Sequence, residues 1–301
     1  MWIILLLAIS LIATSFLVWQ SKQTNDLLQT RFDQVIGLRQ LIYLLRFHRR
    51  QSHQCLSQIH SPAQKELNEA KAIRALLQTL VNRAEHTHKP MHRILRQRIN
   101  SLLNEWFHFS VRRNQAIHGK AIRHVLYLID DIITQSLLAA GKEQLFNQYQ
   151  AFWPITLNAI DSLSRFRHTI ENYNVDNSGS KQELKLHIKM VQRRLGQLSV
   201  LMRQTPPAFM LDELQADFDQ INLDSEDVMM TKQSLYQLSL RISDTIFILF
   251  DVMLRDIAND ISVRFPAINL NDANIIPLDI KSDKQAGHKS KKSRIVVTGV
   301  K

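Results

Sequence analysis

Arginine occurs at positions where the apolar faces of predicted amphipathic helices require aliphatic side chains. One apolar stripe continues at helical spacing from Leu45 to Arg49 and Ser52, and another continues from Leu163 to Arg167. A buried guanidinium is costly unless a carboxylate or a bound anion compensates its charge. Its planar fork offers parallel donors that match an oxyanion. The pattern therefore predicts either internal ion pairs or a site for a small anion.

Two further arginines complete the candidate anion-binding set. Arg241 lies on the edge of the apolar stripe of the last long helix, so spacing alone leaves its direction open. Arg50 directly follows Arg49 and is less clearly directed inward. The alternative for each arginine is a side chain that reaches water or pairs with a carboxylate of the chain. The nearby acids are Asp161, Glu171 and Asp244.

Other chemistry is not indicated. The sequence has no Gly-rich phosphate loop, no H-E-x-x-H and no G-x-S-x-G, so we expect neither a catalytic residue nor a cofactor. His86, His88 and His92 are close in sequence, but Pro90 is expected to break the helix between them, and we expect no metal site. The single cysteine, Cys55, excludes an internal disulfide.

Long helices must position these arginines. Only 7 Gly and 7 Pro punctuate the chain, and apolar residues follow helical spacing between them. The first predicted helix continues from the apolar N-terminal segment through Leu27 to Ile59, and the fourth follows Gly119 and ends at Ala140. The others are Pro62–Glu85, Pro90–Arg113, Glu143–Tyr173, Lys181–Arg203, Leu211–Ile221 and Ser225–Val263. Gly141 is expected to end the fourth of them as a C-terminal cap.

Each predicted helix carries one apolar stripe that only its neighbours can cover. We therefore expect an all-α protein with two up-and-down four-helix bundles, over about residues 21–141 and 142–265. Residues 266–301 carry seven Lys and Arg after residue 280, with little opposing charge, and are expected to form a flexible basic tail.

The first segment of the chain predicts a membrane anchor. The run WIILLLAISLIATSFLVW, from Trp2 to Trp19, has no charged residue and would be about 27 Å long as a helix. We expect a single transmembrane helix over residues 1–20, with a cleaved signal peptide as the alternative. Lys22, Arg31 and Arg39 follow the span, so the positive-inside rule places the body in the cytoplasm rather than the periplasm.

The net charge of +11 attracts anions of every kind. An anionic membrane surface is one expected partner. Nucleic acid is not expected, because no reading helix and no aromatic stacking platform accompanies the basic residues.

At these same arginines the chain resembles the nitrate- and nitrite-sensing (NIT) domain of bacterial receptors and antitermination regulators. The family pattern L-x-x-L-x-x-E-R-G-x-S is similar to LRQLIYLLRFHRRQS, with Arg49 at the arginine and His48 and Arg50 in place of the glutamate and glycine. The family's E-x-x-G-x-E-R is similar to DSLSRFR, which ends at Arg167, and LSLRISD places Arg241 at a third family arginine.

This resemblance implies two four-helix bundles stacked end to end, a homodimer, a location at the bacterial inner membrane and an anion held by Arg49, Arg167 and Arg241, with Arg50 beside them. The sequence thus predicts a membrane-anchored sensor for a small oxyanion, with nitrate or nitrite favoured, that signals through helix shifts to an unknown output protein. The alternative is a structural or scaffolding membrane protein without a small-molecule ligand.

Overall fold

The structure is a computed structural model that describes residues 2–57, 67, 69–174, 176–202, 208–221 and 228–266. Within these ranges the chain forms helices and no strand, as the sequence predicts. The helices are α1 (Trp2–Ser57), α2 (Glu69–Arg83), α3 (Lys89–Glu105), a short 3₁₀ helix η1 (Trp106–His108), α4 (Val111–Ala139), α5 (Glu143–Glu171), α6 (Ser178–Leu201), α7 (Ala208–Asp219) and α8 (Val228–Asp260). The predicted tail from residue 267 on lies outside the described residues.

Local capping explains both ends of α4. The Ser110 side chain accepts a hydrogen bond from the Arg113 amide and so starts α4 at Val111, whereas the sequence predicted a start after Gly119. Gly141 takes a positive φ of 63° beyond the end of α4, which confirms the predicted C-terminal cap. Glycine reaches this conformation without the strain that a Cβ would cause.

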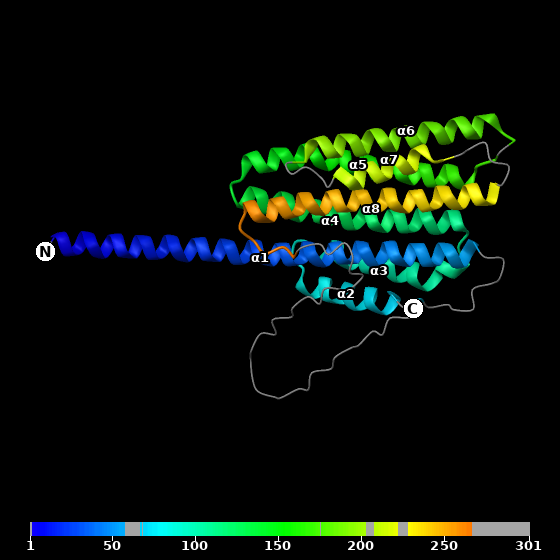
Figure 1. Cartoon of the computed structure of the whole chain (residues 1–301). Coiled ribbons are helices and arrows are strands. Elements are labelled where there is room, and N and C mark those ends of the chain that lie inside the picture. Colours follow the sequence, from blue (N-terminus) through cyan, green and yellow to red (C-terminus); the bar gives the residue numbers. More distant parts are fainter. Residues whose placement is uncertain are drawn as a thin grey trace, which may run out of the picture. The chain divides into compact units, whose positions relative to one another are not determined.

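The helices pack in two connected sets. α1 packs against α2 and α4, and α3 closes against α2 and α4 (Figure 1). α5 packs against α4, α6 and α8, and α7 lies on α8. The two sets share the α4–α5 contact and belong to one compact unit, so they lie side by side rather than end to end. Their core is aliphatic and aromatic, with Trp106, Tyr149, Phe152 and Phe166 among its largest fully buried side chains.

The predicted transmembrane helix, Trp2–Trp19, is wrong. Among the residues that the structure describes, no helix is long and apolar enough to cross a membrane. The segment is the first part of the 56-residue helix α1. Ser10, Thr14 and Ser15 interrupt its apolar run, and the helix continues with the polar residues Gln20 to Lys22.

The turn before α3 also differs from the prediction. Pro90 lies in the first helical turn, where its missing N–H costs nothing, and it does not break the helix. The His92 amide donates to the carbonyl of His88, so both histidines belong to the same helix start. Within the described part of the chain, no group of three or more His, Cys, Asp or Glu residues could hold a metal ion.

Candidate functional site

Ion pairs link α1 and α8, which run antiparallel to each other. Arg39 pairs with Asp251 at 2.6 Å, and Arg46, seven residues later, pairs with Asp244, seven residues earlier. Arg46 also donates from Nε to the Ser243 hydroxyl at 3.2 Å. A heptad step keeps residues on one helix face, so these pairs form a seam along α1 and α8. We call it the arginine seam.

Arg49 lies beside the arginine seam and has no such partner. Its side chain is buried, with a relative exposure of 6%, and its Nε is buried without a hydrogen-bond acceptor. No carboxylate of the described residues lies within ion-pair distance of its guanidinium, in contrast to Arg39 and Arg46. Arg49 is therefore a buried cation without a direct counter-charge.

Arg167 reaches the same region from α5. It is also only 6% exposed, and it donates from Nε to the Ser239 hydroxyl at 3.1 Å and from Nη2 to the Ser239 carbonyl at 2.9 Å. Both acceptors are neutral, and no carboxylate in the described ranges pairs with Arg167. The hydrogen bonds fix the guanidinium against α8 but leave its charge uncompensated.

Burial weakens the protonation of both guanidiniums. Burial lowers the pKa of Arg49 to about 10, and the positive charges of Arg46 and Arg50 act in the same direction. Burial lowers the pKa of Arg167 well below its usual value, with Arg49 as the next cause. Arginine nevertheless stays charged at neutral pH. Four cations thus share one region in which Asp244 is the carboxylate that acts on both buried guanidiniums.

Tyr236 lies near both buried arginines. The Ser239 hydroxyl that accepts from Arg167 donates in turn to the backbone carbonyl of Tyr236 at 2.7 Å, so Arg167 is bound to the helical turn that carries Tyr236. On α1, His53 lies one turn after Arg49 and stacks on the Tyr236 ring. The Tyr236 hydroxyl is buried and has no hydrogen-bond partner. An acceptor bound here would find donors from α1, α5 and α8.

His53 is neutral in this site at neutral pH. Burial lowers its pKa to about 4, and the charges of Arg167 and Arg49 add to the effect. The amide nitrogen of Gln115, on α4, lies 3.0 Å from His53 Nδ1. His53 therefore adds no positive charge to the site, and its ring packs against the ring of Tyr236.

A buried polar network holds the turn of α1 that carries Arg49. The Ser52 hydroxyl donates to the Arg49 carbonyl at 3.1 Å, and Asn114 on α4 donates to Ser52 at 2.9 Å. One turn away, His48 Nδ1 lies 2.9 Å from His118 Nε2, and His118 Nδ1 lies 2.9 Å from the Asn114 carbonyl. These bonds attach α1 to α4 at the turn of α1 that carries Arg49.

The structure brings together two of the four arginines singled out in the sequence. Arg49 and Arg167 meet at the turn of Tyr236 and Ser239. Arg50 is half-exposed at the edge of the arginine seam, 3.7 Å from Asp244. Arg241 does not join them: its side chain is 60% exposed and pairs with Asp217 on α7. The 3.6-residue period of α8 turns Arg241 away from the face that Ser239 and Tyr236 share.

Sequence reasoning missed Tyr236, Ser239, His53 and Arg46. One signal for the arginine seam was present, because Arg39 and Arg46 have the same seven-residue spacing as Asp244 and Asp251. Matching these spacings in reverse order would have predicted that α1 and α8 are antiparallel neighbours. No comparable signal marks Tyr236, since its role depends on which side chains α1 and α5 bring to it.

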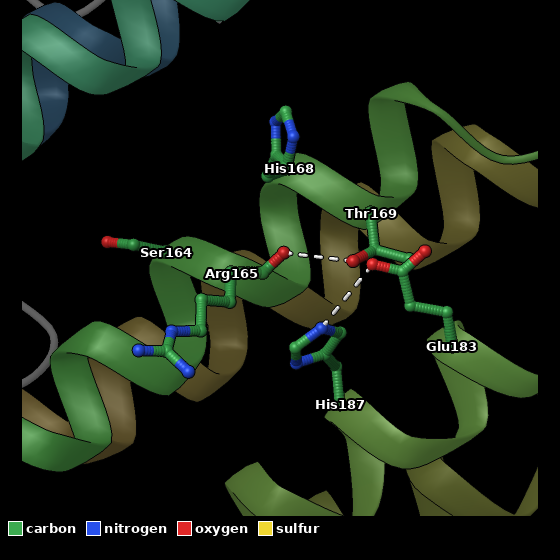
Figure 2. Close-up of a pocket in the computed structure, with 6 residues that line it drawn as sticks. All are labelled: Ser164, Arg165, His168, Thr169, Glu183 and His187. Atoms are coloured by element: carbon green, nitrogen blue, oxygen red, sulfur yellow. Dashed lines mark hydrogen bonds and ion pairs between the residues drawn. The ribbon is translucent and has the colours of Figure 1, made fainter. Parts of the chain in front are cut away.

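A separate pocket of about 450 Å³ lies on the opposite face of α5. Figure 2 shows its lining residues, with Glu183 and His187 from α6 facing Thr169 on α5. Glu183 and His187 lie 3.8 Å apart, and the Thr169 hydroxyl donates to the Arg165 carbonyl within α5. The pocket holds acidic and basic groups together, so it lacks the excess of positive charge that distinguishes the site of Arg49 and Arg167.

No protein-family model, no curated protein and no solved structure matches this chain. The resemblance to the nitrate- and nitrite-sensing domains therefore stays a prediction.

Proposed function

We propose that this protein is a sensor or binding module for a small oxyanion, with nitrate or nitrite favoured, held by Arg49 and Arg167. The proposal rests above all on one observation: two buried guanidiniums adjoin without a carboxylate of the described residues within ion-pair distance of either. A bound anion would supply the missing negative charge, and the planar fork of each arginine suits its oxygens.

The position of the site suggests how binding produces a signal. Arg49 belongs to α1 and Arg167 to α5, and Arg167 is hydrogen-bonded to Ser239 on α8. An anion that bonds both arginines draws these helices together, and its removal restores the repulsion between the two cations. Small helix shifts of this kind alter the surface that a separate output protein would recognise.

Titration calorimetry and thermal-shift measurements with sodium nitrate and sodium nitrite test the proposal. We expect the wild-type protein to bind one or both anions and to become more heat-stable with them. Arg49→Lys keeps the charge but removes the fork, and we expect it to weaken binding at least tenfold. Arg241→Ala is the matched control, because it removes an arginine outside the site, and it should bind as the wild type does.

The scaffolding alternative predicts a different result. A protein whose arginines only hold its helices together would give neither binding heat nor anion-dependent stabilisation in wild type or variants. Equal affinity of wild type and Arg49→Lys would likewise overturn the assignment of Arg49. Sodium chloride at equal ionic strength, which supplies no oxyanion, separates specific binding from general salt screening.

A further inference from the structure

The Tyr236 hydroxyl lies near both buried arginines and has no hydrogen-bond partner. Its oxygen is buried and makes no hydrogen bond, whereas the serine three residues later on the same face of α8 is fully bonded. A buried O–H without a partner costs about 1–3 kcal/mol. Such a group indicates an acceptor that completes the site when it is bound.

We propose that Tyr236 is a third ligand residue of this site, and that its hydroxyl makes the site selective for anions with more than one acceptor oxygen. This inference rests on the proposed function. Arg49, Arg167 and Tyr236 approach from α1, α5 and α8, so their donors come from different directions. An anion with two or three oxygens presents a separate acceptor to each donor, whereas a halide has a single centre for all of them.

The surroundings of Tyr236 fix the direction of this hydroxyl. His53 stacks on one face of the ring at a centroid distance of 3.8 Å, with the planes 16° apart. The backbone of Tyr236 is tied through Ser239 to Arg167. The ring therefore has little freedom to turn its hydroxyl toward water, and the donor stays inside the site before the anion arrives.

The experiment compares nitrite, nitrate and bromide in wild type and in Tyr236→Phe. This variant removes a neutral donor and leaves every charge of the site in place. We expect oxyanion affinity to fall about tenfold, because hydrogen bonds to charged groups are the stronger ones, and bromide affinity to change less than about threefold. Tyr127→Phe, at a half-exposed tyrosine of α4, is the matched control and should keep wild-type affinity for all three anions.

A spectroscopic measurement separates a ligand residue from a packing residue. The chain has 5 tyrosines, and isotope labelling of their Cζ atoms gives NMR signals that report on hydrogen bonding of each hydroxyl. The signal absent from Tyr236→Phe should shift when nitrite or nitrate is added to the wild type. The signal of Tyr127, assigned in the same way, should not.

The binding and NMR results distinguish failure of the proposed function from failure of the role of Tyr236. Absence of oxyanion binding in the wild type overturns the proposed function itself. Wild-type binding with equal oxyanion affinity in Tyr236→Phe, or with a Tyr236 signal that does not move, overturns the inference and leaves the proposed function intact. An equal loss for bromide overturns the selectivity, because the hydroxyl would then act on any anion.

Discussion

His53 on α1 and Tyr236 on α8 stack with their ring centroids 3.8 Å apart. The stack follows the arginine seam, since His53 lies seven residues after Arg46, and Tyr236 lies eight before Asp244. Where a third arginine and acid would continue the pattern, two uncharged rings occupy the seam. Arg49 and Arg167 lie near His53, and neither has a carboxylate partner among the described residues. The arginine seam is therefore charge-paired at Arg46 and Asp244, whereas the arginines beside the ring stack are not paired.

Removing Arg49 should stabilise the protein when no anion is present. Arg49→Met replaces a buried, uncompensated cation by an apolar side chain of similar length, and we expect a gain of about 1–2 kcal/mol. Arg39→Met should do the opposite and cost about 3 kcal/mol, because it leaves the mostly buried carboxylate of Asp251 without Arg39. Urea unfolding in nitrate-free buffer measures both. A loss of stability in Arg49→Met would mean that Arg49 is already compensated in the folded chain.

Asp244 should weaken anion binding. Asp244→Asn removes the carboxylate that pairs with Arg46 and Arg50, which raises the positive potential at Arg49 and Arg167. We expect nitrate affinity to rise about threefold to tenfold, while stability falls by about 1 kcal/mol because the Asp244 side chain is 47% exposed. Asp217→Asn makes the same charge change away from the site, and its affinity should stay at the wild-type value. Calorimetry would contradict this account if both variants bound more tightly to the same extent.

The fold should lose stability as the pH falls from 6.5 toward 4. Burial, with a contribution from Arg74, lowers the pKa of His48 to about 4. The unfolded chain therefore binds a proton in this range that the folded chain excludes, and the difference amounts to about 3 kcal/mol when complete. His118, in contact with His48, also has a pKa lowered by burial and by that neighbour.

Urea unfolding at several pH values tests this expectation. His48→Gln should reduce the slope of stability against pH between 6.5 and 4, whereas His108→Gln, at an exposed position of η1, should keep it. Identical slopes in His48→Gln and wild type would show that the His48 site does not exclude the proton.

Two glycines should respond in opposite ways to the same substitution. Gly141→Ala places a Cβ at a φ of 63° and should cost about 1 kcal/mol, although no atom lies within 4 Å of the added carbon. Gly196→Ala, in the interior of α6 and equally free of neighbours, should add about 0.5–1 kcal/mol through helix propensity. Thermal unfolding compares them directly, and a common sign for both changes would contradict the backbone argument.

The helical period of the sequence was sufficient to predict the all-α class and the inward direction of Arg49 and Arg167. The face of a helix on which a side chain lies is a local property, because it depends only on the residue's spacing from its neighbours in the sequence. The same reasoning was insufficient for Arg241, which lies on the edge of its stripe and whose exposed side chain pairs with Asp217. It also misplaced the start of α4, where the capping hydrogen bond of Ser110 prevails over the loop signal of Gly119.

By itself the sequence determined where the helices run and which arginines interrupt their apolar faces. Only the tertiary structure decided that Arg49 and Arg167 adjoin, that Arg46 has an acid and Arg49 has none, and that the Tyr236 hydroxyl is left without a partner. The physical reason is that compensation of a charge depends on distances between groups from different helices, and helix pairing brings together residues far apart in the chain.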